Sequence, residues 1–184
     1  MNYVRGFAPW LCYAALSPLD WRLGMCAAAL VAVLSLAGRL RAGGVDLLGA
    51  ATCAFFVAMA VISLAAPESG LNTWTCALAN AVLAVTALAS LVVRRPFTLS
   101  IARSQVPEKF WNAPGFIRVN MVLTGVWTTA FAAAAVACAL IVAYDHAATL
   151  PLITVQVLGF VIPFVISGRY AARAQAKAVA HTTA

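Results

Sequence analysis

The sequence predicts an all-α, polytopic transmembrane helical bundle, and three observations carry this prediction. The 184 residues are 64% apolar and 9% charged, whereas ordinary soluble domains are about 45–50% apolar and about 25% charged. The apolar residues fall into segments of roughly the 20 residues that a helix needs to cross a bilayer. Basic residues gather in alternate connections between these segments. We therefore expect one membrane domain that covers residues 1–184.

About six membrane segments are predicted, and the first is unusual. It is short and interrupted by Pro9 and Pro18, so it is either a short or tilted span or a re-entrant piece. Non-helical backbone at membrane depth is stable only where protein or water surrounds it. The charge pattern favours six crossings over five crossings plus a re-entrant piece. The expected segments are 6–19, 21–38, 45–66, 71–93, 119–144 and 149–168, with a cytoplasmic tail over 169–184.

The basic residues also predict an orientation. When the chain is threaded six times across a bilayer, eleven of its twelve Lys and Arg residues fall on one side. The opposite connections carry Asp20, Glu68 and Asp145, with Arg22 as their one basic residue. Lys and Arg near membrane ends stay on the cytoplasmic side. We therefore expect both termini and the long connection 94–118 to be cytoplasmic.

The connection 94–118 is predicted to lie at the level of the lipid headgroups. Pro96 ends the preceding helix, Pro107 begins a short helix before Glu108, and Pro114–Gly115 breaks the helical pattern. Phe97, Leu99 and Ile101 alternate, which leaves an extended or mixed conformation open. Aromatic rings interleaved with bases are typical of the interface. The expected partner- or lipid-binding residues are Arg94, Arg95, Pro96, Phe97, Thr98, Arg103 and Trp111.

The chain shows no pattern of catalytic or metal-binding residues. Its spans contain no Asp, Glu, Lys, Arg or His away from their ends, although ionisable groups in a membrane usually mark ion paths and active sites. We expect neither enzyme activity nor a cofactor or metal. The bases sit at segment ends and not on one amphipathic element, so nucleic-acid binding is not expected either.

The five cysteines are expected to act as small apolar packing residues. All of them lie inside apolar segments, and none forms a C-x-x-C pair or has a His at metal-ligand spacing. They are Cys12, Cys26, Cys53, Cys76 and Cys138.

Neutral polar residues supply two alternatives for the last spans. Asn120, Thr124 and Thr128 follow one another at intervals of four, on one face of the fifth span, and Gln156 lies in the sixth. Small and hydroxyl residues let membrane helices approach and hydrogen-bond, so helix packing is the first interpretation. The alternative is a polar cavity lined by Asn120, Thr124, Trp127, Thr128 and Gln156.

The order of several short motifs resembles a known family. They are carried by Phe7, Pro9, Trp10, Arg95, Pro96, Trp111, Asn120, Trp127 and Phe131. This order is similar to that of the intracellular septation protein A family of small bacterial inner-membrane proteins. That family has Trp-Ala-x-Phe-Phe after its loop, where this chain has Trp127–Thr128–Thr129–Ala130–Phe131, and the stretches 95–98 and 102–103 also depart from it. The resemblance implies a role in the cell envelope with division and wall-elongation proteins, and no catalysis.

From these observations we expect a non-catalytic interaction or scaffold protein of the cell envelope, located in the bacterial inner membrane. Its expected partners are the bilayer, anionic lipid headgroups and other envelope membrane proteins, with a second copy of the chain as a further candidate. The alternative is a small permease or channel that uses the polar face of spans four to six. A membrane enzyme is a third reading, for which no residue set supports a reaction.

Overall fold

The structure, a computed structural model, describes residues 2–41, 47–103, 106–145 and 148–182, with side chains between residues 8 and 174. Within these ranges all regular structure is helical, which confirms the all-α class. The elements are α1 (Asn2–Leu16), α2 (Trp21–Arg41), α3 (Leu47–Ala65), α4 (Leu71–Val92), α5 (Thr98–Arg103), the 3₁₀ helix η1 (Glu108–Phe110), α6 (Pro114–Tyr144) and α7 (Thr149–Thr182).

Five of the described helices are long and apolar enough to cross a membrane: α2, α3, α4, α6 and the part of α7 over Thr149–Ala174. α1 has 15 residues, so at 1.5 Å per residue it is about 22 Å long, shorter than a hydrocarbon core. It is nevertheless one continuous helix through Pro9. Pro9 lies in the interior of α1 and has no amide hydrogen to donate, so one hydrogen bond of the helix is missing there while the helix continues. α1 is therefore not a hairpin that leaves on the side it entered.

The turn between α1 and α2 is short and close-packed. The Asp20 carboxylate accepts hydrogen bonds from the amides of Arg22 (2.7 Å) and Leu23 (3.2 Å) and so caps the start of α2. A Cβ on Gly24 would lie 3.0 Å from the backbone nitrogen of Ser17. A residue without a Cβ thus lets α2 pass directly beside the turn.

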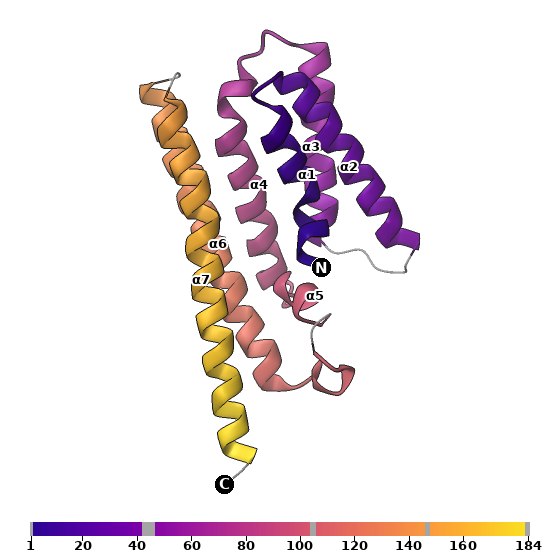
Figure 1. The fold of residues 1–184 in the computed structure, drawn as a ribbon, viewed down its shortest axis with the longest axis vertical. Coiled ribbons are helices and arrows are strands. Elements are labelled where there is room, and N and C mark those ends of the chain that lie inside the picture. Colours follow the sequence, from indigo (N-terminus) through magenta and orange to yellow (C-terminus); the bar gives the residue numbers. More distant parts are fainter. Residues whose placement is uncertain (1, 42–46, 104–105, 146–147, 183–184) are drawn as a thin grey trace.

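The long helices alternate in direction, as Figure 1 shows. α1, α3 and α6 begin at the same end of the bundle, where α2, α4 and α7 finish. We call this the basic end, because its described helix ends and connections carry Arg39, Arg41, Arg94, Arg95, Arg103, Lys109 and Arg118. The other end, which we call the acidic end, carries Asp20, Glu68 and Asp145.

Two packed groups share α4. In the first, residues of α2 and α3 such as Met25, Phe56 and Met59 are buried together, and Trp10 of α1 stacks on Phe55 at a ring distance of 5.6 Å. In the second, Leu83 of α4 packs with Phe131 of α6. Because Ala79 belongs to the first group and Leu83 to the second, one turn of α4 joins the two halves of the bundle.

Several helices differ in extent from the expected membrane segments, mostly at the basic end; at the acidic end α1 finishes at Leu16, where the expected segment ran to 19. α6 begins at Pro114 and not at 119, because proline suits the first position of a helix and here starts the helix that it was expected to interrupt. α7 continues from the expected limit at 168 to Thr182. The two helices have 31 and 34 residues, about 46 and 51 Å, so both project beyond the hydrocarbon core of a bilayer. Residues 45–46 of the third expected segment lie outside the described residues.

Candidate functional site

The segment after α4 is inserted into the bundle at the basic end. Pro96, Phe97, Thr98 and Leu99 are buried, with Phe97 only 7% exposed. The Ser90 hydroxyl donates to the carbonyl of Ala87 (2.7 Å) and accepts the Phe97 amide (3.2 Å). The expectation that Phe97 buries its ring in the membrane interface is therefore wrong, because the bundle itself covers this ring.

Thr98 bonds the same segment to α6. Its hydroxyl donates to the carbonyl of Asn120 at 3.0 Å and lies 2.9 Å from the hydroxyl of Thr124. All three residues are buried, Thr124 completely. The Asn120 amide nitrogen donates to Phe116 (2.9 Å), but its side-chain oxygen has no partner within the described structure. Residues 98–103 form the helix α5. The sequence left an extended or a mixed conformation open for 97–106, and the extended conformation is wrong for 98–103. Residues 104–105 lie outside the described residues.

We call the buried stretch Pro96–Leu99, with its bonds to Ser90, Asn120 and Thr124, the anchor. Outside the anchor, the connection presents basic side chains. We define the basic platform as Arg94, Arg95, Arg103, Lys109 and Trp111; its four bases are exposed and Trp111 is half-buried. The Arg103 guanidinium lies 5.3 Å from the centre of the Trp111 ring, whose Nε1 donates to the carbonyl of Val106 at 2.9 Å. A cation–π contact of this kind stabilises by about 0.5–1 kcal/mol at exposed sites. The expected short helix after Pro107 is confirmed, as η1.

Arg94 has an uncommon backbone conformation. Its φ is 55°, and it is the only non-glycine residue of the described chain with a positive φ. The Arg94 amide donates to Leu91 and the Arg95 amide to Ser90, each at 2.9 Å. These two bonds form a Schellman motif at the end of α4, and the left-handed position of this motif is usually glycine. A side chain with a Cβ costs about 1–2 kcal/mol there.

The residues of the expected polar cavity are found in separate hydrogen bonds. Thr128 donates to the carbonyl of Thr124 one turn earlier (2.8 Å), and the Trp127 indole donates to the Ser167 hydroxyl of α7 (3.1 Å). Neither the hollow between α1, α2 and α3 nor the one between α4 and α6 is lined by Asn120, Thr124, Trp127, Thr128 or Gln156. These contacts are those of helix packing.

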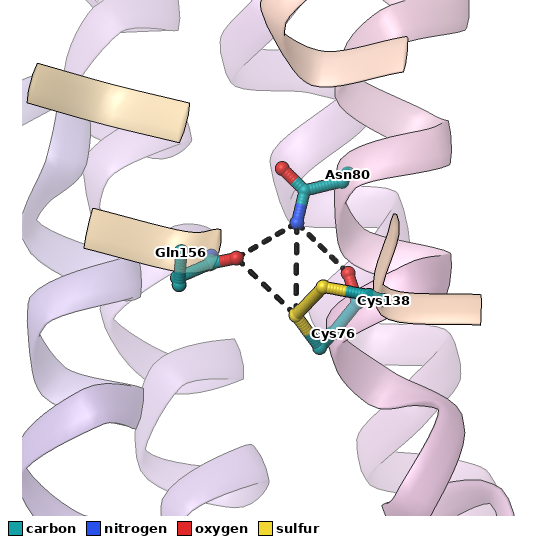
Figure 2. The surroundings of a disulfide bond; sticks show 4 residues. All are labelled: Cys76, Asn80, Cys138 and Gln156. Carbon is teal, nitrogen blue, oxygen red and sulfur yellow. Dashed lines mark hydrogen bonds between the residues drawn. A yellow bond between two sulfur atoms is a disulfide. The ribbon is translucent and has the colours of Figure 1, made fainter. Parts of the chain in front are cut away.

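A covalent link lies toward the acidic end. A disulfide joins Cys76 of α4 to Cys138 of α6, whose Cα atoms are 6.1 Å apart, and Figure 2 shows the polar side chains around it. The Asn80 amide donates to the carbonyl of Cys76 (2.9 Å) and to the Gln156 side-chain oxygen (2.8 Å), which lies 3.3 Å from Cys76 Sγ. The expectation that all five cysteines only fill space is wrong for this pair.

The structure brings together part of the expected site. Thr98, Asn120 and Thr124 meet at the anchor, although they were expected in two separate sets. Gln156 lies apart, bonded to Asn80. Ser90 and Arg118 were not among the expected site residues, although Ser90 lies four residues after Thr86 and Arg118 is one of the bases of the connection. Among the described residues no three His, Cys, Asp or Glu side chains come together in a metal-binding group.

No family model, curated protein or solved structure matches the chain. The fold defines the class of protein: a helical bundle in which five of the described helices have membrane-crossing length.

Proposed function

We propose that this chain is a multi-pass protein of the bacterial inner membrane with a non-catalytic interaction role, and that the basic platform is its binding surface. The observation that supports this most is the contrast within one connection. Pro96–Leu99 are buried and bonded to both α4 and α6, while the bases on either side of them are exposed.

A connection that only fixed topology would need basic charge and no defined shape, because Lys and Arg act there by charge alone. This one is held by the bond from the Phe97 amide to the Ser90 hydroxyl, by the bond from the Thr98 hydroxyl to the Asn120 carbonyl, and by the Arg103–Trp111 contact. A surface ordered in advance loses less conformational entropy when a partner binds. The anchored connection is therefore suited to recognition, and an acidic protein segment or an anionic headgroup has the complementary charge.

The orientation belongs to the same proposal. With the basic end in the cytoplasm, both termini and the platform face that compartment, and α1 forms a sixth, short crossing. The resemblance to the intracellular septation protein A family adds the expectation that the partners are division and wall-elongation proteins of the envelope. The apolar surface of α7 is consistent with a lipid environment, since only 6% of the residues in its most apolar stretch of 18 are buried inside the protein.

A permease or channel is the weaker candidate. It would need a hydrated path, and the hydroxyls of Thr124 and Thr128 are already bonded within the protein. Flux through liposomes that contain the purified protein, compared with empty liposomes, separates this candidate from the first.

The proposed function is tested by exchanging Arg for Lys and not by deleting the loop, because a deletion would remove the buried anchor. The double variant Arg95→Lys, Arg103→Lys keeps charge and topology and removes bidentate recognition of carboxylate or phosphate. Arg173→Lys, at an exposed position of α7, is the matched control. We expect crosslinking in intact cells to lose at least one defined partner by about tenfold in the double variant alone. An identical crosslinking profile in all three proteins would contradict the proposal.

A further inference from the structure

A second feature of the basic end is an open surface hollow, with about 550 Å³ of space, between the end of α4 and the start of α6. Arg94, Asn112, Pro114, Ile117, Arg118 and Met121 line it. The lining contains two guanidinium groups and an amide but no acid.

Neither guanidinium has an anionic partner in the part of the chain that the structure describes. Within the described residues no hydrogen bond or ion pair is found for the side chain of Arg94 or of Arg118. Two like charges that face one hollow repel each other, and an anion between them reverses this effect. Arg binds phosphate through two parallel hydrogen bonds, so this pair suits a phosphate group in particular.

The backbone at Arg94 is an independent observation. The left-handed position after α4 would be occupied at lower cost by glycine, yet it carries one of the two guanidiniums of the hollow. Residues held in sparsely populated conformations concentrate at binding sites, where the surrounding structure maintains them.

The level of the hollow along the membrane normal favours a lipid ligand over a free ion. From Tyr144 at the acidic end to Arg118, α6 rises by about 39 Å, and a bilayer with its headgroup layers is about 40–45 Å thick. Arg118 thus lies at headgroup level when Tyr144 lies at the opposite surface. The side of the hollow formed by Ile117 and Met121, one turn apart, is apolar and leads toward the hydrocarbon core.

We infer that this hollow binds the phosphate of an anionic glycerophospholipid, with Arg94 and Arg118 on the phosphate, Asn112 on the polar headgroup, and Ile117 and Met121 against the first carbons of the acyl chains. Basic pockets between transmembrane helices at the cytoplasmic side are suited to such headgroups. The inference rests on the orientation given under the proposed function and assigns a ligand to the same end of the bundle.

The test measures binding of phosphatidylglycerol to the purified full chain in detergent micelles, by native mass spectrometry titration with a parallel fluorescence titration. Both titrations run at the same ionic strength for every variant, because Arg94 and Arg118 are themselves exposed and salt screens their charges. The variants are Arg94→Gly and Arg118→Gln, and Arg173→Gln removes one exposed charge of α7 outside the hollow.

We expect Arg94→Gly and Arg118→Gln each to weaken binding by about tenfold or more, because each removes charged hydrogen bonds. Arg173→Gln should change it by less than about twofold. Arg94→Gly should melt at or above the wild-type temperature, since glycine relieves the left-handed residue. A loss of binding with unchanged or higher stability excludes unfolding as its cause.

Two results would overturn the inference. In the first, both hollow variants bind phosphatidylglycerol as tightly as the Arg173 control. In the second, inorganic phosphate binds wild type as tightly as the lipid does, which assigns the hollow to a soluble anion. Neither result depends on Arg95 and Arg103, so the proposed function stands or fails separately in the crosslinking experiment.

Discussion

The hydrogen bond that anchors the basic platform to α6 can be removed without changing the shape of a side chain. Thr98→Val leaves no cavity, but it takes away the hydroxyl between the Asn120 carbonyl and the Thr124 hydroxyl. A buried polar group left without its partner costs about 1–3 kcal/mol. Thr124 can turn its O–H toward the carbonyl of Asn120, one helical turn earlier, so we expect the lower part of this range, about 1–2 kcal/mol.

Local opening of α5 should report this loss. Segments open independently of the whole protein, and amide hydrogen exchange measures the population of the open form. A loss of about 1–2 kcal/mol raises that population roughly 5- to 30-fold. We therefore expect the amides of Phe97 to Ile101 to exchange faster by this factor in Thr98→Val, as measured by mass spectrometry in micelles.

A double variant, in which Thr98 and Thr124 are both replaced, tests whether the unpaired hydroxyl causes the faster exchange. Replacing both partners of a buried hydrogen bond by apolar groups can be nearly neutral, so Thr98→Val with Thr124→Val should exchange more slowly than Thr98→Val alone. Thr129→Val, on an exposed face of α6, is the control and should match wild type. If Thr98→Val exchanges at the wild-type rate, or the double variant exchanges fastest, the anchor does not depend on this bond.

Three further predictions concern the packing of the helices. Gly24→Ala should destabilise the protein by about 1–3 kcal/mol, because its Cβ would lie 3.0 Å from the backbone of Ser17; an unchanged melting temperature in micelles would contradict this contact. Gln156→Leu should cost about 0.6–1 kcal/mol, since it removes the acceptor of the Asn80 amide, and a variant that melts with or above wild type would show that the bond contributes nothing. Alkylation of the denatured protein should modify three cysteines without reductant and five with it; five without reductant would exclude the disulfide between α4 and α6.

The membrane-length helices were predictable because hydropathy and charge are local properties of the sequence. The errors lie where helices leave the apolar region. Hydropathy reports the extent of the membrane and not of the helix, so the first turn of α6 at Pro114 and the continuation of α7 after 168 were missed. α1 was recognised as short, but its continuity through Pro9 could not be predicted from the sequence, because an interior proline usually bends or ends a helix.

The candidate site was predictable only in part. Exposed Arg94, Arg95 and Arg103 follow from their charge, but an aromatic ring beside bases has the same pattern whether it faces lipid or a neighbouring helix. The burial of Phe97 depends on Ser90 and on the packing around it. The pairing of Cys76 with Cys138 depends likewise on the rotation of α4 against α6, across 62 residues of sequence.

The proposed binding surface and the proposed lipid site both require that the basic end face the cytoplasm, and cysteine accessibility in intact cells tests this most directly. In a background without the native cysteines, single cysteines replace Ser69 at the acidic end and Asn112 at the basic end, both exposed. A membrane-impermeant maleimide should label position 69 from outside, and position 112 only after the inner membrane is opened. Labelling of position 112 from outside, with position 69 protected, would reverse the orientation and contradict the proposed cytoplasmic platform.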